Sequence, residues 1–572
     1  MKTYTQIFSL LVVTNCCYAQ TPYVFTDFPL NDEGNIHDMH PENFCVYNGR
    51  LIFSAYGKNF GAELWSTDGT SAGTYMIKDI NPTAPGSFGG GSNPGGFTEI
   101  DEKLIFVATT DELGRELWIT DGTKSNTKIL KDIFTGPGPS NPGGFTRLGN
   151  KILFRAKTSS TNNELWVTDG TASGTMLLKD IRPGDAGSDP NLFTLFNGKV
   201  YFAANDGVNG TELWVSDGTT PGTYMVKDID SGRRDSNPAS FTVLSGKIYF
   251  YAKTVKYGSE LWTTDGTANG THMVKDIYPG YENGVISHST NPIPERFAVY
   301  NNKLYFSAND SINGYELWCS DGTNPGTYMV KDINKGIESS QSVHQYAVYK
   351  NKLYFTAYDG MHGSELWVTD GSNAGTQLVV DLSPGSSYSV PSYFIMFDDH
   401  LYYRGRKSTD QFNFQLIQTD GTAAGTKVMN NPAEKWHEPL LATREFIVYD
   451  SALYFAASYD DHGNELWSFS DTTGRSISPR GEENNDSINN NTHLSISLYP
   501  NPNDGRFTLE CSSDYFIGST ALIIDMLGRE VSQRSIDSVK TKIEVSNLAQ
   551  GAYKAVIHLD KKTYSKTFVK FE

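Results

Sequence analysis

A short stretch that recurs nine times constrains the fold of this chain more than any other feature. Its first copy runs from Glu63 to Ile80 and reads ELWSTDGTSAGTYMIKDI. An eroded eighth copy carries Ile417 at the marker position, and tryptophan holds that position in the other copies, at Trp65, Trp118, Trp166, Trp214, Trp262, Trp318, Trp367 and Trp467. Successive markers lie 48 to 56 residues apart. This period, with β-forming side chains, predicts a β-propeller or another array of β-sheets.

Each copy of the repeat contains four short β-type runs. In the fifth copy they cover residues 241–244, 247–252, 260–264 and 271–277, and Gly, Asn and Asp turns separate them. Four such runs predict one antiparallel four-stranded sheet. No window shows helical periodicity, so the expected fold class is all-β.

The two ends of the array indicate how it closes. The last copy stops after its third run at residues 465–469, whereas residues 23–28 resemble a fourth run without the preceding three. We therefore predict a closed β-propeller of about nine four-stranded blades, in which the N-terminal strand closes the last blade. The alternative is an eight-bladed ring in which the eighth copy folds differently. In the closed arrangement the first run of each copy is innermost, and the connections between blades share one face.

The expected domain organisation has four parts. Residues 1–20 resemble a signal peptide, with Lys2 before an apolar core and Cys17-Tyr18-Ala19 before Gln20. Acylation of Cys16, as in a lipoprotein, is the alternative. Residues 21–470 form the propeller, the polar residues 471–493 a flexible linker, and residues 494–572 a small β-sandwich.

Charge and cysteine content limit the partners. The formal net charge is −18, which argues against nucleic acid and disfavours an anionic membrane surface. No later stretch is long and apolar enough for a transmembrane helix. After signal removal Cys45, Cys319 and Cys511 remain, too far apart in the predicted ring for a structural disulfide.

Two resemblances follow from these motifs. Copies such as Glu63-Leu64-Trp65 with Asp68-Gly69-Thr70 resemble the bacterial ELWxxDGT repeat family, a likeness that covers residues 42–471 and implies no settled activity. The C-terminal part is similar to the type IX secretion sorting domains of Bacteroidetes. The residues that carry this likeness are Pro500, Asn501, Pro502, Gly505, Gly528, Gly551 and Tyr553. It implies handling by the type IX machinery and a secreted or cell-surface location.

The motifs that recur most often have structural explanations. Each Asp-Gly-Thr step predicts a self-bonded hairpin loop. Calcium is a weak alternative, because one carboxylate per loop is too few for a cation that takes six or more oxygens. The calcium candidates are Asp68, Asp121, Asp169, Asp217, Asp265 and Asp321. The tryptophans are expected to be core residues between blades.

Strand geometry also predicts cross-strand pairs. If Thr67 lies opposite Thr74, Trp65 lies opposite Met76, and Glu63 forms an ion pair with Lys78. The Ser-Asn-Pro sequence that recurs at Ser92, Ser140 and Ser236 is expected to be a turn that leads into the inner strand. The segment His37-Asp38-Met39-His40 has metal-like composition, but without a third ligand it is expected to be a solvated loop.

Three functions remain open, and no catalytic, cofactor or metal motif decides between them. The first is a secreted or cell-surface propeller that binds an extracellular glycan or protein through variable inter-blade loops. The second is a secreted polysaccharide hydrolase or lyase with a site at the channel mouth. Its loose candidates are Glu99, Asp101, Asp185, Asp189, Glu282 and Glu295. The third is a structural surface or matrix component.

Overall fold

A computed structural model describes most of the chain. The described residues are 23–24, 39–57, 60–70, 72–82, 91–285, 297–407, 414–429, 440–458, 464–470, 496–499, 506–511, 516–525, 530–548, 551–559 and 562–570. All secondary-structure elements within them are β-strands, which confirms the all-β prediction. The chain divides into two compact units, Met1–Asp471 and Thr472–Glu572. The described part contains no helix long and apolar enough to cross a membrane.

The described residues of the first compact unit form nine four-stranded sheets, numbered here in chain order. Sheets 1 to 4 consist of β2 (Glu42–Tyr47), β3 (Arg50–Gly57), β4 (Gly61–Thr67), β5 (Tyr75–Lys78); β6 (Gly95–Ile100), β7 (Lys103–Thr110), β8 (Gly114–Thr120), β9 (Lys128–Lys131); β10 (Gly143–Leu148), β11 (Lys151–Ala156), β12 (Glu164–Thr168), β13 (Met176–Lys179); and β14 (Asn191–Phe196), β15 (Lys199–Asn205), β16 (Thr211–Ser216), β17 (Tyr224–Lys227).

Sheets 5 to 9 follow the same order. They consist of β18 (Ala239–Leu244), β19 (Lys247–Thr254), β20 (Gly258–Thr264), β21 (His272–Lys275); β22 (Ala298–Tyr300), β23 (Lys303–Asn309), β24 (Tyr315–Ser320), β25 (Tyr328–Lys331); β26 (Gln341–Tyr349), β27 (Lys352–Tyr358), β28 (Ser364–Thr369), β29 (Gln377–Val380); β30 (Ser392–Phe397), β31 (His400–Gly405), β32 (Gln415–Thr419), β33 (Lys427–Val428); and β34 (Leu440–Tyr449), β35 (Ala452–Ser458), β36 (Asn464–Phe469) with β1 (Tyr23–Val24).

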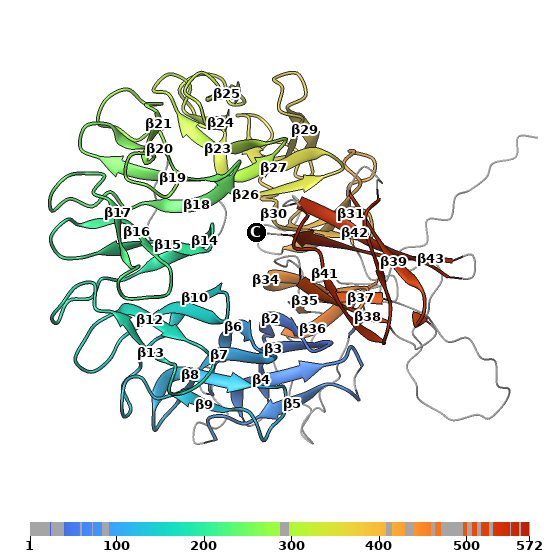
Figure 1. The fold of residues 1–572 in the computed structure, drawn as a ribbon. Coiled ribbons are helices and arrows are strands. Elements are labelled where there is room, and N and C mark those ends of the chain that lie inside the picture. The colour runs from blue at the N-terminus through green and yellow to red at the C-terminus, as the bar shows by residue number, and fades with distance from the viewer. Residues whose placement is uncertain are drawn as a thin grey trace, which may run out of the picture. The chain divides into compact units, whose positions relative to one another are not determined.

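Each sheet is an antiparallel meander, which gives it two distinct ends. The turns between first and second strands share one end with the Asp-Gly-Thr loops, and we call this the hairpin face. The loops between second and third strands share the other end with the connections to the next sheet, and we call this the connection face. The sheets succeed one another about a common centre, with their first strands innermost (Figure 1). The eroded eighth copy also forms a four-stranded sheet.

The hydrophobic core lies between successive sheets. Tyr47, Ile52 and Leu64 of sheet 1 pack against Phe106 and Trp118 of sheet 2, and all five are buried. An aromatic side chain of every first strand also contacts an aromatic side chain of the second strand, as Phe97 contacts Phe106 with ring centroids 5.7 Å apart. Because each sheet is apolar on both faces, it needs a neighbour on each side.

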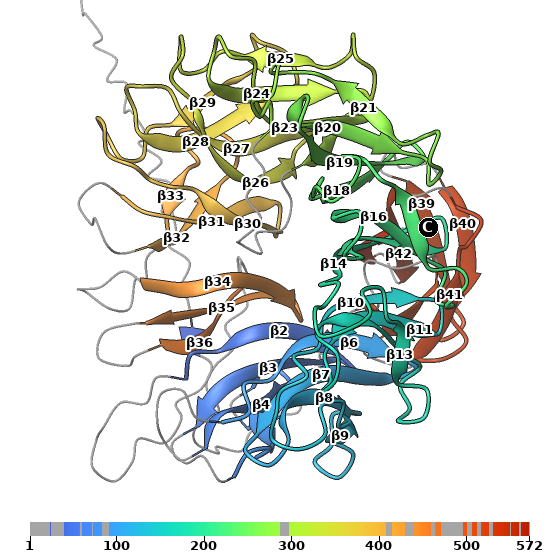
Figure 2. The same cartoon turned by 90° about the vertical axis from the view of Figure 1, so that its left-hand side faces the viewer.

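Sheet 9 lies between sheets 8 and 1 (Figure 2). Leu466 of sheet 9 shares a buried cluster with Phe53 and Trp65 of sheet 1. The Tyr449 hydroxyl donates to the Gly49 carbonyl across this contact, at 2.7 Å. The short strand β1 pairs with β36, with Val24 opposite Trp467.

The register between third and fourth strands corrects one prediction. Trp65 lies opposite Met76, as predicted, but Lys78 lies opposite Leu64 and not opposite Glu63. A β-bulge between Leu64 and Trp65 shifts the register by one residue. The predicted Glu63–Lys78 ion pair is therefore wrong, and the same bulge separates Glu212 from Lys227 and Glu260 from Lys275.

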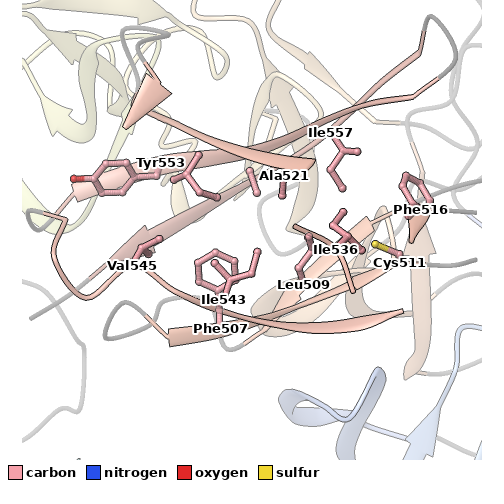
Figure 3. Packing of buried hydrophobic residues seen from close by; sticks show 12 residues of the cluster. Phe507, Leu509, Cys511, Phe516, Ala521, Ile536, Ile543, Val545, Tyr553 and Ile557 are labelled. Atoms are coloured by element: carbon pink, nitrogen blue, oxygen red, sulfur yellow. The ribbon is translucent and has the colours of Figure 1, made fainter. Parts of the chain in front are cut away.

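The second compact unit contains two sheets. One consists of β37 (Ile496–Tyr499), β38 (Arg506–Cys511) and β41 (Lys540–Glu544), and the other of β40 (Glu530–Ser535), β39 (Thr520–Asp525), β42 (Gly551–Leu559) and β43 (Lys562–Lys570). Figure 3 shows Phe507 and Ile543 from the first sheet facing Ala521 and Ile557 from the second. The predicted linker and signal peptide lie outside the described residues.

Candidate functional site

The Asp-Gly-Thr loops are closed by their own side chains. In the third copy Asp169 Oδ1 accepts the Thr171 amide and hydroxyl at 2.9 and 2.7 Å, and the hydroxyl accepts the Gly174 amide at 2.9 Å. The hydrogen bond from the Thr171 hydroxyl lowers the pKa of Asp169. A Cβ on Gly174 would lie 2.1 Å from Asp169 Oδ1, so a side chain there would displace the carboxylate from its present position.

The same closure recurs at each calcium candidate, whose Oδ1 accepts two hydrogen bonds from the following Thr. These carboxylates are Asp68, Asp121, Asp169, Asp217, Asp265 and Asp321. Within the described residues, no group of three or more His, Cys, Asp and Glu side chains could hold a metal ion. Calcium binding at these loops stays a prediction.

In sheets 1 to 7 the glutamate before the Leu-Trp pair is buried and anchors the outgoing connection. Glu116 accepts the Ile133 amide at 2.8 Å, the Ser140 amide at 3.0 Å and the Ser140 hydroxyl at 2.6 Å. Ile133 lies just after β9, the fourth strand of sheet 2, whereas Ser140 lies just before β10, the first strand of sheet 3. One carboxylate therefore holds both ends of the connection.

Equivalent carboxylates hold the other connections. The further pairs with a serine hydroxyl donor are Glu63–Ser92, Glu164–Ser188, Glu212–Ser236 and Glu365–Ser389. Burial raises the pKa of Glu212 to about 7, against the hydrogen bonds from Ser236 and Ile229 that lower it. Gly284 replaces the serine beside Glu260, and burial raises the pKa of Glu260 to about 8.

The lysine that ends the fourth strand in sheets 1 to 6 reaches the next sheet. Lys78 Nζ donates to the Thr127 carbonyl of sheet 2 at 2.6 Å and lies 5.8 Å from the centre of the Trp118 ring. This carbonyl belongs to an Asp-Gly-Thr loop, so the cation ties one loop to the preceding sheet. Further lysines with such a carbonyl bond are Lys179, Lys227, Lys275 and Lys331.

The marker tryptophans are all buried, and Ile417 is buried at the same place in sheet 8. They offer no exposed ring on which a sugar could stack. The repeat's Glu, Trp and Lys residues thus serve the contacts of the sheets, and the aspartate of each Asp-Gly-Thr step closes its own loop. The glutamate contacts were not predicted, although one signal was available: glutamate and serine lie 24 residues apart in the second, third, fourth, sixth and seventh copies.

Within the segment 37–40, Met39 and His40 serve the contact of sheets 9 and 1. His37 and Asp38 lie outside the described residues. The amides of Met39 and His40 donate to the Asn464 carbonyl of sheet 9 at 2.9 and 3.1 Å. Met39 is buried, so at this residue the expected solvated loop is wrong.

The loose catalytic candidates lie at different ends of the sheets. Glu99 and Asp101 lie toward the hairpin face, where β6 turns into β7. Asp185 and Asp189 lie between β13 and β14, and Glu282 follows β21, all on the connection face. Glu295 lies outside the described residues.

The connection face is the part of the first compact unit that differs most between copies. The connection from sheet 2 to sheet 3 spans residues 132–142, whereas that from sheet 5 to sheet 6 spans residues 276–297. A rigid scaffold with unequal loops at one end is the usual arrangement of a binding surface. The connection face is therefore the candidate functional site.

The fold and this face define an all-β, propeller-like class of protein. Residues 497–571 match the family of secretion system C-terminal sorting domains. This match supports type IX secretion to the cell surface or the extracellular space. Tyr553 lies buried in β42 and Gly551 begins that strand, whereas Pro500, Asn501, Pro502, Gly505 and Gly528 lie outside the described residues.

Solved structures with related folds are distant. A puromycin-hydrolysing peptidase of Mycobacterium tuberculosis is 11% identical over 68% of this chain, with a TM-score of 0.32, and this chain spans 61% of its length. The β-propeller domain of the Trilobed protease from Pyrococcus furiosus is 14% identical over 60% of this chain and 99% of its own, with a TM-score of 0.28. Such similarities carry no argument about function. A search among curated proteins gave no match.

Proposed function

We propose that this protein is a secreted or cell-surface β-propeller that binds an extracellular ligand, a glycan or a protein, through its inter-sheet connections. One observation carries the proposal: the residues that recur in the copies are used in contacts of the sheets, and the connections differ. The buried Glu116 and the interlocked Asp169 loop show this use most clearly. Recognition is then left to the segments that are not shared.

We also propose that the nine sheets form a closed ring, and that the copies belong with the ELWxxDGT repeats they resemble. Three contacts support closure: the pairing of β1 with β36, the buried cluster of sheets 9 and 1, and the Tyr449–Gly49 hydrogen bond. An open array would leave the apolar faces of its two end sheets uncovered.

The proposed route begins with a signal peptide at residues 1–20. Residues 471–493 then link the propeller to the sorting domain, which the type IX machinery handles. Deletion of residues 494–572 tests this route in the producing cell. The shortened protein should accumulate in the periplasm, as measured by cell fractionation. Unchanged export of the shortened protein would contradict the proposal.

Ligand binding is tested with the mature chain on a glycan array and on a panel of polysaccharides. Exchange of the connection at residues 230–236 for that at residues 182–188 should change the binding profile, because only the connection face is altered. Exchange of the turn at residues 245–246 for Asn-Gly, on the hairpin face, is the control and should leave binding intact. Absence of both glycan binding and polysaccharide cleavage would exclude the carbohydrate ligands. The described residues give no observation that favours the hydrolase or the matrix component.

A further inference from the structure

Sheets 7 and 8 meet without a side-chain pair that ties other neighbouring sheets together. Between sheets 6 and 7, Lys331 Nζ donates to the Thr376 carbonyl at 2.6 Å and lies 5.9 Å from the centre of the Trp367 ring. At the next joint Val380 holds the place of the lysine and Ile417 that of the tryptophan. Aliphatic side chains neither donate hydrogen bonds nor take part in cation–π contacts. Both members of this tie are therefore absent between sheets 7 and 8.

The loop that would accept the missing lysine is nevertheless in place. In sheet 8 the hydroxyls of Thr419 and Thr426 are hydrogen-bonded at 2.7 Å, as those of Thr369 and Thr376 are in sheet 7. The Thr426 carbonyl therefore corresponds to the carbonyl that Lys331 reaches in sheet 7. The eighth copy has kept its own loop and lost a tie to the preceding sheet.

The joint between sheets 8 and 9 lacks its glutamate. Gln415 takes the place of the glutamate that precedes the marker in sheet 7, and it is buried. The Oε1 atom of Gln415 has no hydrogen-bond partner. In sheet 7, by contrast, Glu365 accepts the Ser389 hydroxyl at 2.5 Å and the Leu382 amide at 3.1 Å. Burial of an oxygen without a donor costs free energy, so Gln415 weakens a joint that a glutamate would close.

Sheet 8 also buries a hydroxyl without a partner. Phenylalanine lies opposite the marker tryptophan in the other eight sheets, whereas Tyr403 lies opposite Ile417 in sheet 8. Tyr403 is fully buried, and its hydroxyl has no hydrogen-bond partner. The adjacent Tyr402 is equally buried, but its hydroxyl accepts Gln418 Nε2 at 2.9 Å. The unpaired hydroxyl of Tyr403 therefore lowers the stability of sheet 8.

We propose that sheet 8 is the segment at which the propeller opens, so that its strands leave sheets 7 and 9 while sheets 1 to 6 remain folded. Parts of a protein open locally in the order of their own stability. Glutamate and lysine ties hold sheets 1 to 6 to their successors, whereas Val380, Ile417 and Gln415 leave sheet 8 attached mainly by apolar contacts. The contact of sheets 9 and 1 through Tyr449 and Gly49 lies outside this segment and stays closed.

Opening at sheet 8 gives the propeller a second arrangement without a second fold. The connections on either side of sheet 8 belong to the connection face. A ligand that binds them in the closed arrangement would stabilise sheet 8 by mass action. The opening itself goes beyond the proposed ligand binding and does not depend on it, because it is measured without ligand. Failure of either proposal is therefore visible without the other.

The test is hydrogen–deuterium exchange of the mature full-length chain, measured on peptides by mass spectrometry. Amides of β31 and β32 in sheet 8 should exchange at least about fivefold faster than those of β19 and β20 in sheet 5, because a hydrogen bond and a cation–π contact are missing. Val380→Lys should slow the exchange of sheet 8 by about threefold or more, because the new ammonium can donate to the Thr426 carbonyl. Gln377→Lys adds the same charge at an exposed place of β29 and is the matched control, which should leave the exchange unchanged.

A second pair of variants separates the two tyrosines. Tyr403→Phe removes a hydroxyl that has no partner and should slow the exchange of sheet 8, whereas Tyr402→Phe removes the acceptor of Gln418 and should speed it. Unchanged exchange in sheets 1 to 4 shows that each variant is folded.

Exchange in sheet 8 that is no faster than in sheet 5 would overturn the proposal. So would exchange in sheet 8 that Val380→Lys leaves unchanged. Equal exchange in all nine sheets would show that the propeller opens as one unit and would overturn it as well.

Discussion

Glu260 shows at the scale of one residue what the serine hydroxyl contributes in the other sheets. Glu260 accepts the amides of Ile277, Tyr278 and Gly284, but Gly284 has no hydroxyl to offer. Burial raises the pKa of Glu260 to about 8, against about 7 for Glu212 beside Ser236. The hydroxyl donor therefore stabilises the ionised carboxylate.

Removal of one such hydroxyl should weaken the array. In Ser188→Ala, Glu164 Oε2 loses the donor at 2.7 Å while its carboxylate stays buried. We expect the free energy of unfolding to fall by about 1–3 kcal/mol, as measured by denaturant unfolding. Ser231→Ala, at an exposed serine of a connection, is the control and should change it by less than about 0.5 kcal/mol.

The buried glutamates should also make stability depend on pH. The pKa of Glu212 rises from 4.5 to about 7, with burial as the largest cause and Asp228 as a further one. A raised carboxyl pKa means that the fold favours the neutral form. The free energy of unfolding should therefore be highest below about pH 4.5 for this group and fall until about pH 7, by on the order of 3 kcal/mol.

Glu212→Gln tests this dependence. The amide does not titrate, so the variant should lose the Glu212 part of the decline in thermal midpoint between pH 4.5 and about 7. The free energy of unfolding of this variant should be lower at each pH. The N–H groups of the glutamine amide would face backbone N–H donors, which the carboxylate oxygens accept in the unaltered chain. An unchanged pH profile would contradict the prediction.

At the scale of the element, most Asp-Gly-Thr loops place a second glycine close to the aspartate. In sheet 4 a Cβ on Gly222 would lie 2.0 Å from Asp217 Oδ1. Gly222→Ala should therefore disrupt the loop and cost about 1–3 kcal/mol in denaturant unfolding. Gly222→Asn is the matched comparison, because Asn126 holds this place in sheet 2 and donates to Asp121 Oδ2 at 2.6 Å. The asparagine variant should lose less free energy of unfolding than the alanine variant.

Calcium should not stabilise these loops. The Asp121 side chain already accepts bonds from Thr123 and Asn126, and each loop offers one carboxylate to a cation that takes six or more oxygens. The thermal midpoint should be the same with excess calcium and with excess chelator. A midpoint that rises with calcium and falls in Asp121→Asn would show that the loops bind the ion.

The strands also show which features of the fold can be predicted from the sequence. Strand periodicity predicts the four runs of each copy, and the pairing of Trp65 with Met76 follows from counting. The bulge beyond Trp65 has no sequence signal, so counting fails at Lys78. The Ser92 hydroxyl donates to Glu63. The local sequence pattern does not predict this pairing, because it depends on how the connection between the two residues folds.

At the scale of the first compact unit, sheet 9 takes its outer strand from the other end of the chain. Deletion of residues 21–30 removes β1 and leaves β36 as an unpaired edge. We expect a lower thermal midpoint and self-association through that edge, as measured by sedimentation velocity. A variant that lacks only Thr21 and Pro22 is the control and should behave like the unaltered chain. No change on the longer deletion would argue against closure by the N-terminal strand.

The glutamate and lysine ties described above point one way along the chain. Glu116 holds the connection that leaves its own sheet, and Lys78 reaches forward to the sheet that follows. In sheets 1 to 6 each copy thus carries two side chains that attach its successor, whereas the bonds from Arg147 to the Glu99 carbonyl and from Thr220 to the Leu178 carbonyl run back to the preceding sheet. Duplication or loss of one such copy would keep the glutamate and lysine ties available at the new joint. Chains of this kind can therefore change copy number by recombination without a new interface, and their evolution is limited mainly by how the last copy meets the first.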